Sequence, residues 1–224
     1  MSSAIRILST KVLSQIQKNK IVGFGCNYVE RNFIEIEAIS FNYTEDKHTL
    51  LFSSQNAVKS VFKNQNYKII LSDKKCYCVG EKTKNLLSEN GQKVANFEEN
   101  SSKLADFIVK NAQNERFLFF CGKERRIDLE DQLSAHKIEI KPLEVYQTFL
   151  KPKTVGAFDF VLFYSPTGVR SFLQNNSLKQ TTSICIGTTT AEALKNNSRK
   201  IIIASKPTIE HMIFQIKKQL QHHD

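Results

Sequence analysis

Glycine and proline are scarce in this chain, with 8 and 4 among 224 residues. Soluble proteins average roughly 7% glycine and 5% proline. This shortage argues against an enzyme that cradles phosphate in glycine-rich loops. The five cysteines are odd in number and include one close pair, which argues against a disulfide framework. Four of them lie in apolar runs and are expected to be reduced and packed as small hydrophobic side chains: Cys76, Cys78, Cys121 and Cys185.

Long apolar runs are also missing. No segment approaches the ~18 apolar residues of a membrane helix. The N-terminal stretch MSSAIRILSTKVL lacks the apolar core of a signal peptide. We therefore expect a soluble, cytoplasmic protein.

Positive charge is in excess, with 32 Lys and Arg against 22 Asp and Glu and a formal net charge of +10. Such a balance predicts an acidic partner, which could be nucleic acid, a membrane surface or a polyanionic small molecule. The hydrophobic fraction of 41% and the charged fraction of 24% are those of an ordinary globular protein. The length is enough for one large or two small domains.

Familiar catalytic and cofactor motifs fail on inspection. Gly23-Phe24-Gly25 lacks the third glycine of a dinucleotide fingerprint, because position 28 is Tyr28. The pair Cys76-x-Cys78 is too tight for a usual zinc pair and has no second pair. A nucleophile elbow, an HExxH helix and the kinase motifs are all absent. We expect neither a metal nor a cofactor.

Short apolar runs alternate with segments of helical period. The expected strands are 4–9, 49–53, 67–71, 76–79, 116–121, 158–164, 183–186 and 200–204. The clearest helix is expected over 208–220, with Ser205 and Pro207 as its start signals. This alternation predicts an α/β fold with doubly wound, largely parallel sheets.

An internal repeat divides the chain. LLFSSQNAVKSVF (50–62) resembles VLFYSPTGVRSFL (161–173), and CYCVGEKTKNLL (76–87) resembles SICIGTTTAEAL (183–194). The next strand of the first unit, RFLFFCGKERR, has its counterpart at the N-terminus in AIRILSTKVL. We therefore expect a discontinuous domain of residues 1–36 plus 148–224 and a second, similar domain of 37–147. Extended segments near 33–41 and 141–149 would form a two-stranded hinge beside a cleft.

Polar turns follow the expected strands. They are Ser53–Asn56, Gly80–Thr83, Gly122–Arg126, Ser165–Gly168 and Gly187–Thr190. In doubly wound sheets such turns border the ligand crevice, and helix N-termini there can bind anions. Ser, Thr and Asn also cap helices without binding anything. Full charges could be added by Lys11, Arg125, Arg126 and Arg170.

The order of these motifs resembles the uroporphyrinogen-III synthase family. The resemblance rests on the two repeated pairs, CGKERRIDLEDQL, the following EVYQT and the closing ASKPTIEHMI, across nearly the whole chain. The chain departs from the family at three places. Ser9-Thr10-Lys11 stands where Thr-Arg-Pro is usual, Cys121-Gly122 where Arg-Gly is usual, and Gln55 where Pro is usual.

The resemblance implies a function. Members of the family are lyases that close the linear tetrapyrrole hydroxymethylbilane into uroporphyrinogen III, with loss of water and inversion of ring D through a spiro intermediate. The resemblance also places the family's functional tyrosine at Tyr146. The expected substrate-binding residues are Ser54, Asn56, Thr83, Arg125, Ser165, Thr167, Thr190 and Lys11. We expect a monomer that binds neither nucleic acid nor a membrane.

Two other interpretations stay open at this point. The chain could be a non-enzymatic two-domain binder of a polyanionic ligand, or a basic nucleic-acid-binding module. The charge distribution bears on both, because residues 37–147 hold 17 Lys and Arg against 16 Asp and Glu. The remaining residues hold 15 against 6. The excess charge therefore belongs to the expected discontinuous domain.

Overall fold

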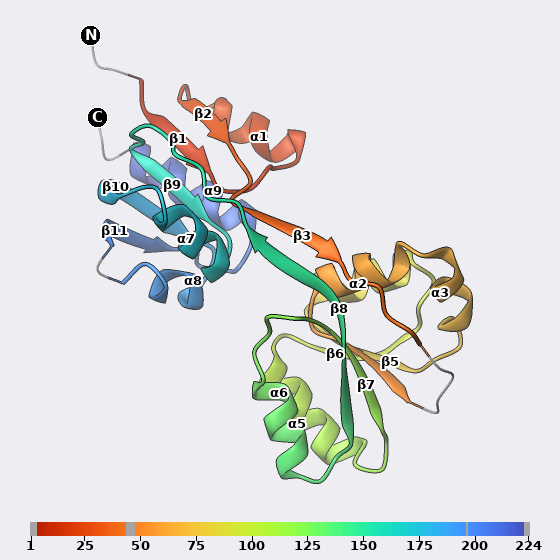
Figure 1. Cartoon of the computed structure of the whole chain (residues 1–224). Helices are drawn as coiled ribbons and strands as arrows, with labels where there is room; N and C mark the ends of the chain where they lie inside the picture. Colours follow the sequence, from red (N-terminus) through yellow and green to blue (C-terminus); the bar gives the residue numbers. More distant parts are fainter. Residues whose placement is uncertain (1–3, 44–47, 196, 222–224) are drawn as a thin grey trace. The chain divides into compact units, whose positions relative to one another are not determined.

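The computed structural model describes residues 4–43, 48–195 and 197–221 (Figure 1). The chain divides into two compact units, Met1–Glu35 with Phe149–Asp224 (unit 1) and Ile36–Thr148 (unit 2). Each unit is an α/β structure built on its own sheet. The predicted α/β class with largely parallel sheets is thus confirmed. The division into domains of 1–36 plus 148–224 and 37–147 stays a prediction.

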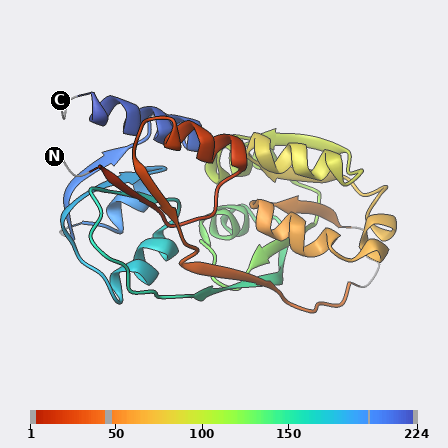
Figure 2. The same cartoon turned by 90° about the horizontal axis from the view of Figure 1, so that it is seen from above.

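Unit 1 contains a parallel sheet in the order β11-β10-β9-β1-β2. Its strands are β1 (Arg6–Ser9), β2 (Asn27–Glu30), β9 (Phe160–Phe163), β10 (Leu178–Cys185) and β11 (Ser198–Ile203). Its helices are α1 (Gln15–Val22), α7 (Pro166–Leu173), α8 (Thr188–Glu192) and α9 (Ile209–Leu220). Figure 2 shows α1 and α9 side by side, where the Gln17 amide donates a hydrogen bond to Glu210 at 2.8 Å.

Alternate residues of the unit 1 strands enter two separate cores. Val161 and Phe163 pack with the apolar side chains of α7 and α8. Phe160 and Leu162 pack with those of α1 and α9. A strand with both faces covered needs apolar residues at every position, which explains the continuous apolar run at Phe160–Phe163.

Unit 2 contains a sheet in the order β3-β8-β7-β4-β5-β6. Its strands are β3 (Ile34–Ala38), β4 (Thr49–Phe52), β5 (Cys76–Val79), β6 (Val94–Glu98), β7 (Phe117–Gly122) and β8 (Ile140–Leu150). Its helices are α2 (Gln55–Phe62), α3 (Gln65–Ile70), α4 (Glu81–Glu89), α5 (Ser101–Asn111) and α6 (Asp128–Ala135). One core lies under α2 and α4, and the other lies under α5 and α6.

The two units repeat one strand order. Read from one edge, unit 1 runs β2-β1-β9-β10-β11, and unit 2 runs β8-β7-β4-β5-β6 with β3 added beside β8. The N-terminal strand β1 pairs with β9 as β7 pairs with β4, which is the place that the repeat predicts for it.

Strands β3 and β8 carry the chain between the units. The Ile39 N–H donates to the Val145 carbonyl at 2.9 Å, and the Lys151 N–H donates to the Phe33 carbonyl at 2.9 Å. These two bonds have an antiparallel register, in contrast to the parallel pairs of the unit sheets. The extended character predicted for both segments is confirmed.

One predicted strand is wrong. We expect residues 67–71 to be extended from their apolar run, but most of this segment belongs to helix α3. The Asn64 side chain caps the helix by accepting from the Asn66 N–H at 3.0 Å. Ile69 is 77% exposed, so this apolar run does not mark a buried strand.

Other local expectations also need correction. Strands β2 and β6 were not predicted, because NYVE and VANFE mix polar with apolar residues. Helix α9 begins at Ile209, one residue after its predicted start, and Thr208 caps it by accepting from the His211 N–H at 3.3 Å. The predicted start signals Ser205 and Pro207 lie just before this cap.

Candidate functional site

The carboxyl end of the unit 2 sheet brings Tyr146 next to Ser54. Ser54 follows β4 and caps helix α2, since its Oγ accepts from the Ala57 N–H at 3.1 Å. The same Oγ lies 3.2 Å from the Tyr146 hydroxyl at hydrogen-bond distance. Two residues that sequence analysis selected separately are therefore direct partners.

A β-bulge sets the position of Tyr146 on strand β8. Cys121 pairs with Glu144 but Gly122 pairs with Tyr146, so Val145 is an extra residue on β8. The Val145 side chain is fully buried in the core. Bulges are found next to active sites, where they redirect a side chain. Here the bulge places Tyr146 opposite the last residue of β7.

Gly122 is the residue that makes room for the tyrosine ring. A Cβ atom at this position would lie 2.6 Å from Tyr146 Cζ and 2.9 Å from its hydroxyl oxygen. The next residue, Lys123, donates its N–H to the Tyr146 carbonyl at 2.9 Å. The ring and the backbone of Tyr146 are thus both held against the end of β7.

Arg125 is already engaged by two carboxylates of its own unit. Its Nε and Nη2 donate to Glu130 at 2.9–3.2 Å, and its Nη1 donates to Glu144 at 3.3 Å. The hydrogen bonds to Glu130 raise the pKa of Arg125 above its ordinary value, although desolvation acts in the opposite direction. A substrate carboxylate at Arg125 would have to share the guanidinium with these partners.

The turn after β5 starts its helix without help from a side chain. Gly80 begins helix α4 with a positive φ of 84° and without a side-chain cap. The Thr83 side chain, predicted as a contact, is instead buried, because the residue is 5% exposed. Asn56, in the first turn of α2, is partly exposed. This edge therefore presents Asn56 and the start of α4.

The matching turns of unit 1 have the same construction. Ser165 caps α7 by accepting from the Gly168 N–H at 3.0 Å. The Thr167 hydroxyl accepts from Arg170 at 3.1 Å. Thr190, the counterpart of Thr83, is 2% exposed, so its side chain is buried in the same way. Gly187 begins α8 without a side-chain cap.

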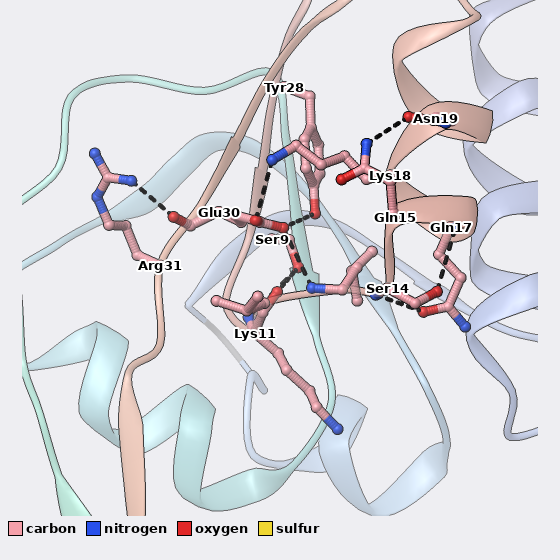
Figure 3. A network of polar contacts seen from close by, with 12 residues as sticks. Ser9, Lys11, Ser14, Gln15, Gln17, Lys18, Asn19, Tyr28, Glu30 and Arg31 are labelled. Atoms are coloured by element: carbon pink, nitrogen blue, oxygen red, sulfur yellow. Dashed lines mark hydrogen bonds and ion pairs between the residues drawn. The ribbon is translucent and has the colours of Figure 1, made fainter.

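A polar network at the carboxyl end of β1 was not predicted beyond Lys11. In Figure 3, Tyr28 and Lys18 donate to Glu30 at 3.0 and 3.3 Å, and the Ser9 hydroxyl bonds to the Lys11 backbone. Desolvation is the main cause of the raised Tyr28 pKa, and the neighbouring Glu30 carboxylate adds to it. Tyr28 and Glu30 were missed because they lie on the unpredicted strand β2, and Ser9 was noted only as part of a departure from the family pattern.

The cysteines behave as small apolar side chains. Cys76, Cys78, Cys121 and Cys185 are free and buried, which confirms the expectation for these four. Burial raises the pKa of Cys121 to about 11 and that of Cys185 to about 12. Such thiols stay protonated near neutral pH and are poor nucleophiles.

Metal clusters and membrane helices are both missing from the described part of the chain. Among its residues, no three His, Cys, Asp or Glu side chains gather as metal ligands would. Within the same residues, no helix combines the length and the apolar character that crossing a bilayer requires.

Comparison with known proteins points to one family. A family model described as uroporphyrinogen-III synthase HemD matches residues 17–213. The porphyrin biosynthesis protein HemD of Ruminiclostridium josui is 26% identical over 184 residues, which cover 73% of this chain and 36% of that protein. The chain thus spans about a third of the length of this curated relative.

Solved structures share the fold. The uroporphyrinogen-III synthetase of Helicobacter pylori 26695 superposes with a TM-score of 0.74 at 21% identity, covering 96% of this chain and 99% of the other. A mutant uroporphyrinogen III synthase of Thermus thermophilus gives a TM-score of 0.65 at 13% identity, covering 98% of this chain and 100% of the other. At these identities the likeness concerns the fold.

Proposed function

Since the chain belongs to the uroporphyrinogen-III synthase family, we propose that it converts hydroxymethylbilane into uroporphyrinogen III. The observation that carries the proposal is the family match over residues 17–213, which includes both repeats and the Tyr146 strand. Neither a purely binding role nor a nucleic-acid-binding role finds support in that match.

The reaction needs control of geometry more than strong activation. Loss of the hydroxymethyl oxygen as water leaves an electrophilic azafulvene on ring A. Ring D attacks through its substituted carbon, and the resulting spiro intermediate fragments and recloses with ring D inverted. Without an enzyme, the substrate closes head to tail into the type I isomer. A protein that orients the two ends of the linear tetrapyrrole can favour the type III product.

Tyr146 is the proposed hydrogen-bond donor to the departing hydroxyl. Its phenol is held by Ser54 at 3.2 Å and its ring by Gly122. A fixed donor near the leaving oxygen assists its departure as water. A group whose rotamer is already restricted needs little reorganisation to act.

The eight carboxylates of the substrate account for the remaining contacts. We propose that Ser54, Asn56, Ser165 and Thr167 meet them through side-chain and backbone groups, and that Lys11 and Arg125 supply full charges. The buried Thr83 and Thr190 are better placed to support the turns that follow β5 and β10, whose backbone N–H groups would then make the contact.

The excess of positive charge in the chain supports a polycarboxylate as the substrate. Residues 36–148 hold 17 Lys and Arg against 16 Asp and Glu, whereas the rest of the chain holds 15 against 6. An excess of cations attracts a polycarboxylate and speeds its encounter, and this effect weakens as salt rises.

The proposal is tested by supplying fresh hydroxymethylbilane and separating the product isomers. We expect type III to predominate and its fraction to rise with protein concentration. Accumulation of type I alone, at the spontaneous rate, would overturn the proposal. We also propose a cytoplasmic location and a monomeric state, and light scattering of the purified chain tests the monomer by giving a mass near 25.7 kDa.

A further inference from the structure

Four consecutive backbone N–H groups between β1 and α1 are each bonded to a side chain of unit 1. Lys11, Val12, Leu13 and Ser14 donate to Ser9 Oγ, Asn32 Oδ1, Glu30 Oε2 and Gln17 Oε1 at 3.4, 2.9, 3.2 and 3.3 Å. An N–H that already donates within the protein has less to offer a bound anion. This turn therefore differs from the starts of α4 and α8, which have no side-chain cap.

Glu30 is the centre of the arrangement. Its carboxylate accepts from the Leu13 N–H, from the Tyr28 hydroxyl at 3.0 Å and from the Lys18 ammonium at 3.3 Å. The Glu30 side chain is 18% exposed, so the three donors replace most of its water. A carboxylate with this many donors is held in one position.

Ser9 also fixes this turn, through hydrogen bonds between its hydroxyl and the Lys11 backbone. The residue is fully buried, and its hydroxyl donates to the Lys11 carbonyl while accepting from the Lys11 N–H. Because a serine hydroxyl has one proton, the Tyr164 hydroxyl at 2.8 Å is then the donor of their hydrogen bond. Both backbone groups of Lys11 are thus bonded to one buried oxygen.

The side chain of Lys11 lies outside this network. Figure 3 shows it pointing away from Ser9 and Glu30, and the residue is exposed. Because the Lys11 backbone is already held, only the lysine side chain must be ordered when an anion binds. The turn therefore fixes the backbone from which the Lys11 side chain extends.

We propose that Ser9 and Glu30 are positioning residues that hold Lys11 to bind a carboxylate of the substrate. This inference rests on the proposed function and deepens it, since it assigns one contact to a cation whose support comes from β1 and β2. Ser9 and Glu30 themselves do not touch the substrate in this arrangement.

The kinetic test is a double-mutant cycle on hydroxymethylbilane turnover. Ser9→Ala should raise KM about fivefold, the effect of one lost hydrogen bond, and leave kcat unchanged. Glu30→Gln should act in the same direction and serves as the second variant if Ser9→Ala folds poorly. In a Lys11→Ala background, Ser9→Ala should raise KM less than about twofold, because the cation it positions is gone.

Ser183→Ala is the matched control. Ser183 is also a fully buried serine of the unit 1 sheet, but its hydroxyl lies 2.8 Å from Ser198 Oγ. We expect its KM to equal that of the wild type. The proposal is overturned if Ser9→Ala raises KM equally with and without Lys11, or if it lowers kcat at unchanged KM.

A second measurement needs no substrate. Amide hydrogen exchange over residues 11–14 should be faster in Ser9→Ala and Glu30→Gln than in the wild type and in Ser183→Ala. Unchanged exchange overturns the positioning role whatever the activity. If exchange is faster in these variants but the wild type forms no type III isomer, the proposed function is overturned, and with it the assignment of Lys11 to this substrate.

Discussion

The ring of Tyr146 lies against the backbone of Gly122 so closely that no other side chain fits there. A Cβ on Gly122 would approach Tyr146 Cζ to 2.6 Å, a separation that nonbonded carbon atoms do not adopt. The β-bulge at Val145 is what brings the two residues opposite each other. The site thus depends on an irregularity of the sheet as well as on residue identity.

Gly122→Ala should displace the Tyr146 ring and lower turnover. Overpacking of this kind typically costs about 1–3 kcal/mol of stability, which chemical denaturation would measure. Isomer separation would measure the loss of type III product. Gly156→Ala is the control, because a Cβ there would lie 3.6 Å from the nearest atom, in the Arg6 side chain. Equal type III formation by Gly122→Ala and the wild type would contradict the placement of Tyr146.

Tyr146→Phe should fold normally and lose about 10²-fold in kcat, since it keeps the ring and removes the proposed donor. Steady-state kinetics gives the loss, and circular dichroism checks the fold. Tyr67→Phe is the matched control, because the Tyr67 hydroxyl donates to the Phe41 carbonyl at 2.8 Å in a structural contact. Unaltered turnover by Tyr146→Phe would remove this residue from the mechanism.

Arg125→Ala should destabilise the protein by about 1–2 kcal/mol, because it leaves the largely buried Glu130 without its cation. The double variant Arg125→Ala with Glu130→Ala should recover part of the lost free energy of unfolding, which urea denaturation measures. A double variant as unstable as the sum of the two single variants would show that the ion pair contributes nothing.

Acid should weaken unit 1 through Glu30. Desolvation opposes ionisation of this carboxyl, but the hydrogen bonds from Leu13 and Tyr28 and the Lys18 ammonium together hold its pKa below the ordinary 4.5. The stabilisation is therefore complete above about pH 4.5 and is lost as pH falls through the lower folded-state pKa. Glu30→Gln should flatten the fall in unfolding free energy across that window.

Glu99→Gln is the control for the acid experiment. Glu99 also has a pKa below its ordinary value, held there by its hydrogen bond to Lys103, but this pair is exposed and screened by water. Its replacement should leave the acid dependence nearly unchanged. Equal effects of the two substitutions would contradict the special role of the Glu30 network.

The apolar strands were predictable because their pattern reflects their environment. Runs such as Phe160–Phe163 and Phe117–Gly122 are buried on both faces, so every position is apolar or small and the pattern is plain. Strands β2 and β6 are mixed in character, and residues 67–71 are apolar but partly exposed. Residue type alone could not assign these segments, because tertiary contacts decide them.

The site was predictable as a set of turns but not as a set of contacts. The repeat and the family resemblance located Ser54 and Tyr146, yet their hydrogen bond depends on the bulge at Val145, which has no signature in the sequence. The burial of Thr83 and the ion pairs of Arg125 likewise depend on packing. The pairing of Glu30 with a backbone N–H at Leu13 joins residues of two elements and could be found only in the structure.

The most direct test of the proposed function is the isomer composition formed from hydroxymethylbilane by the wild type and by Tyr146→Phe at equal concentration. We predict predominant type III product from the wild type, and a shift toward spontaneous type I product when the tyrosine hydroxyl is removed. Type I product alone from the wild type would contradict the proposed function. Identical type III yields and rates from both proteins would contradict the role of Tyr146.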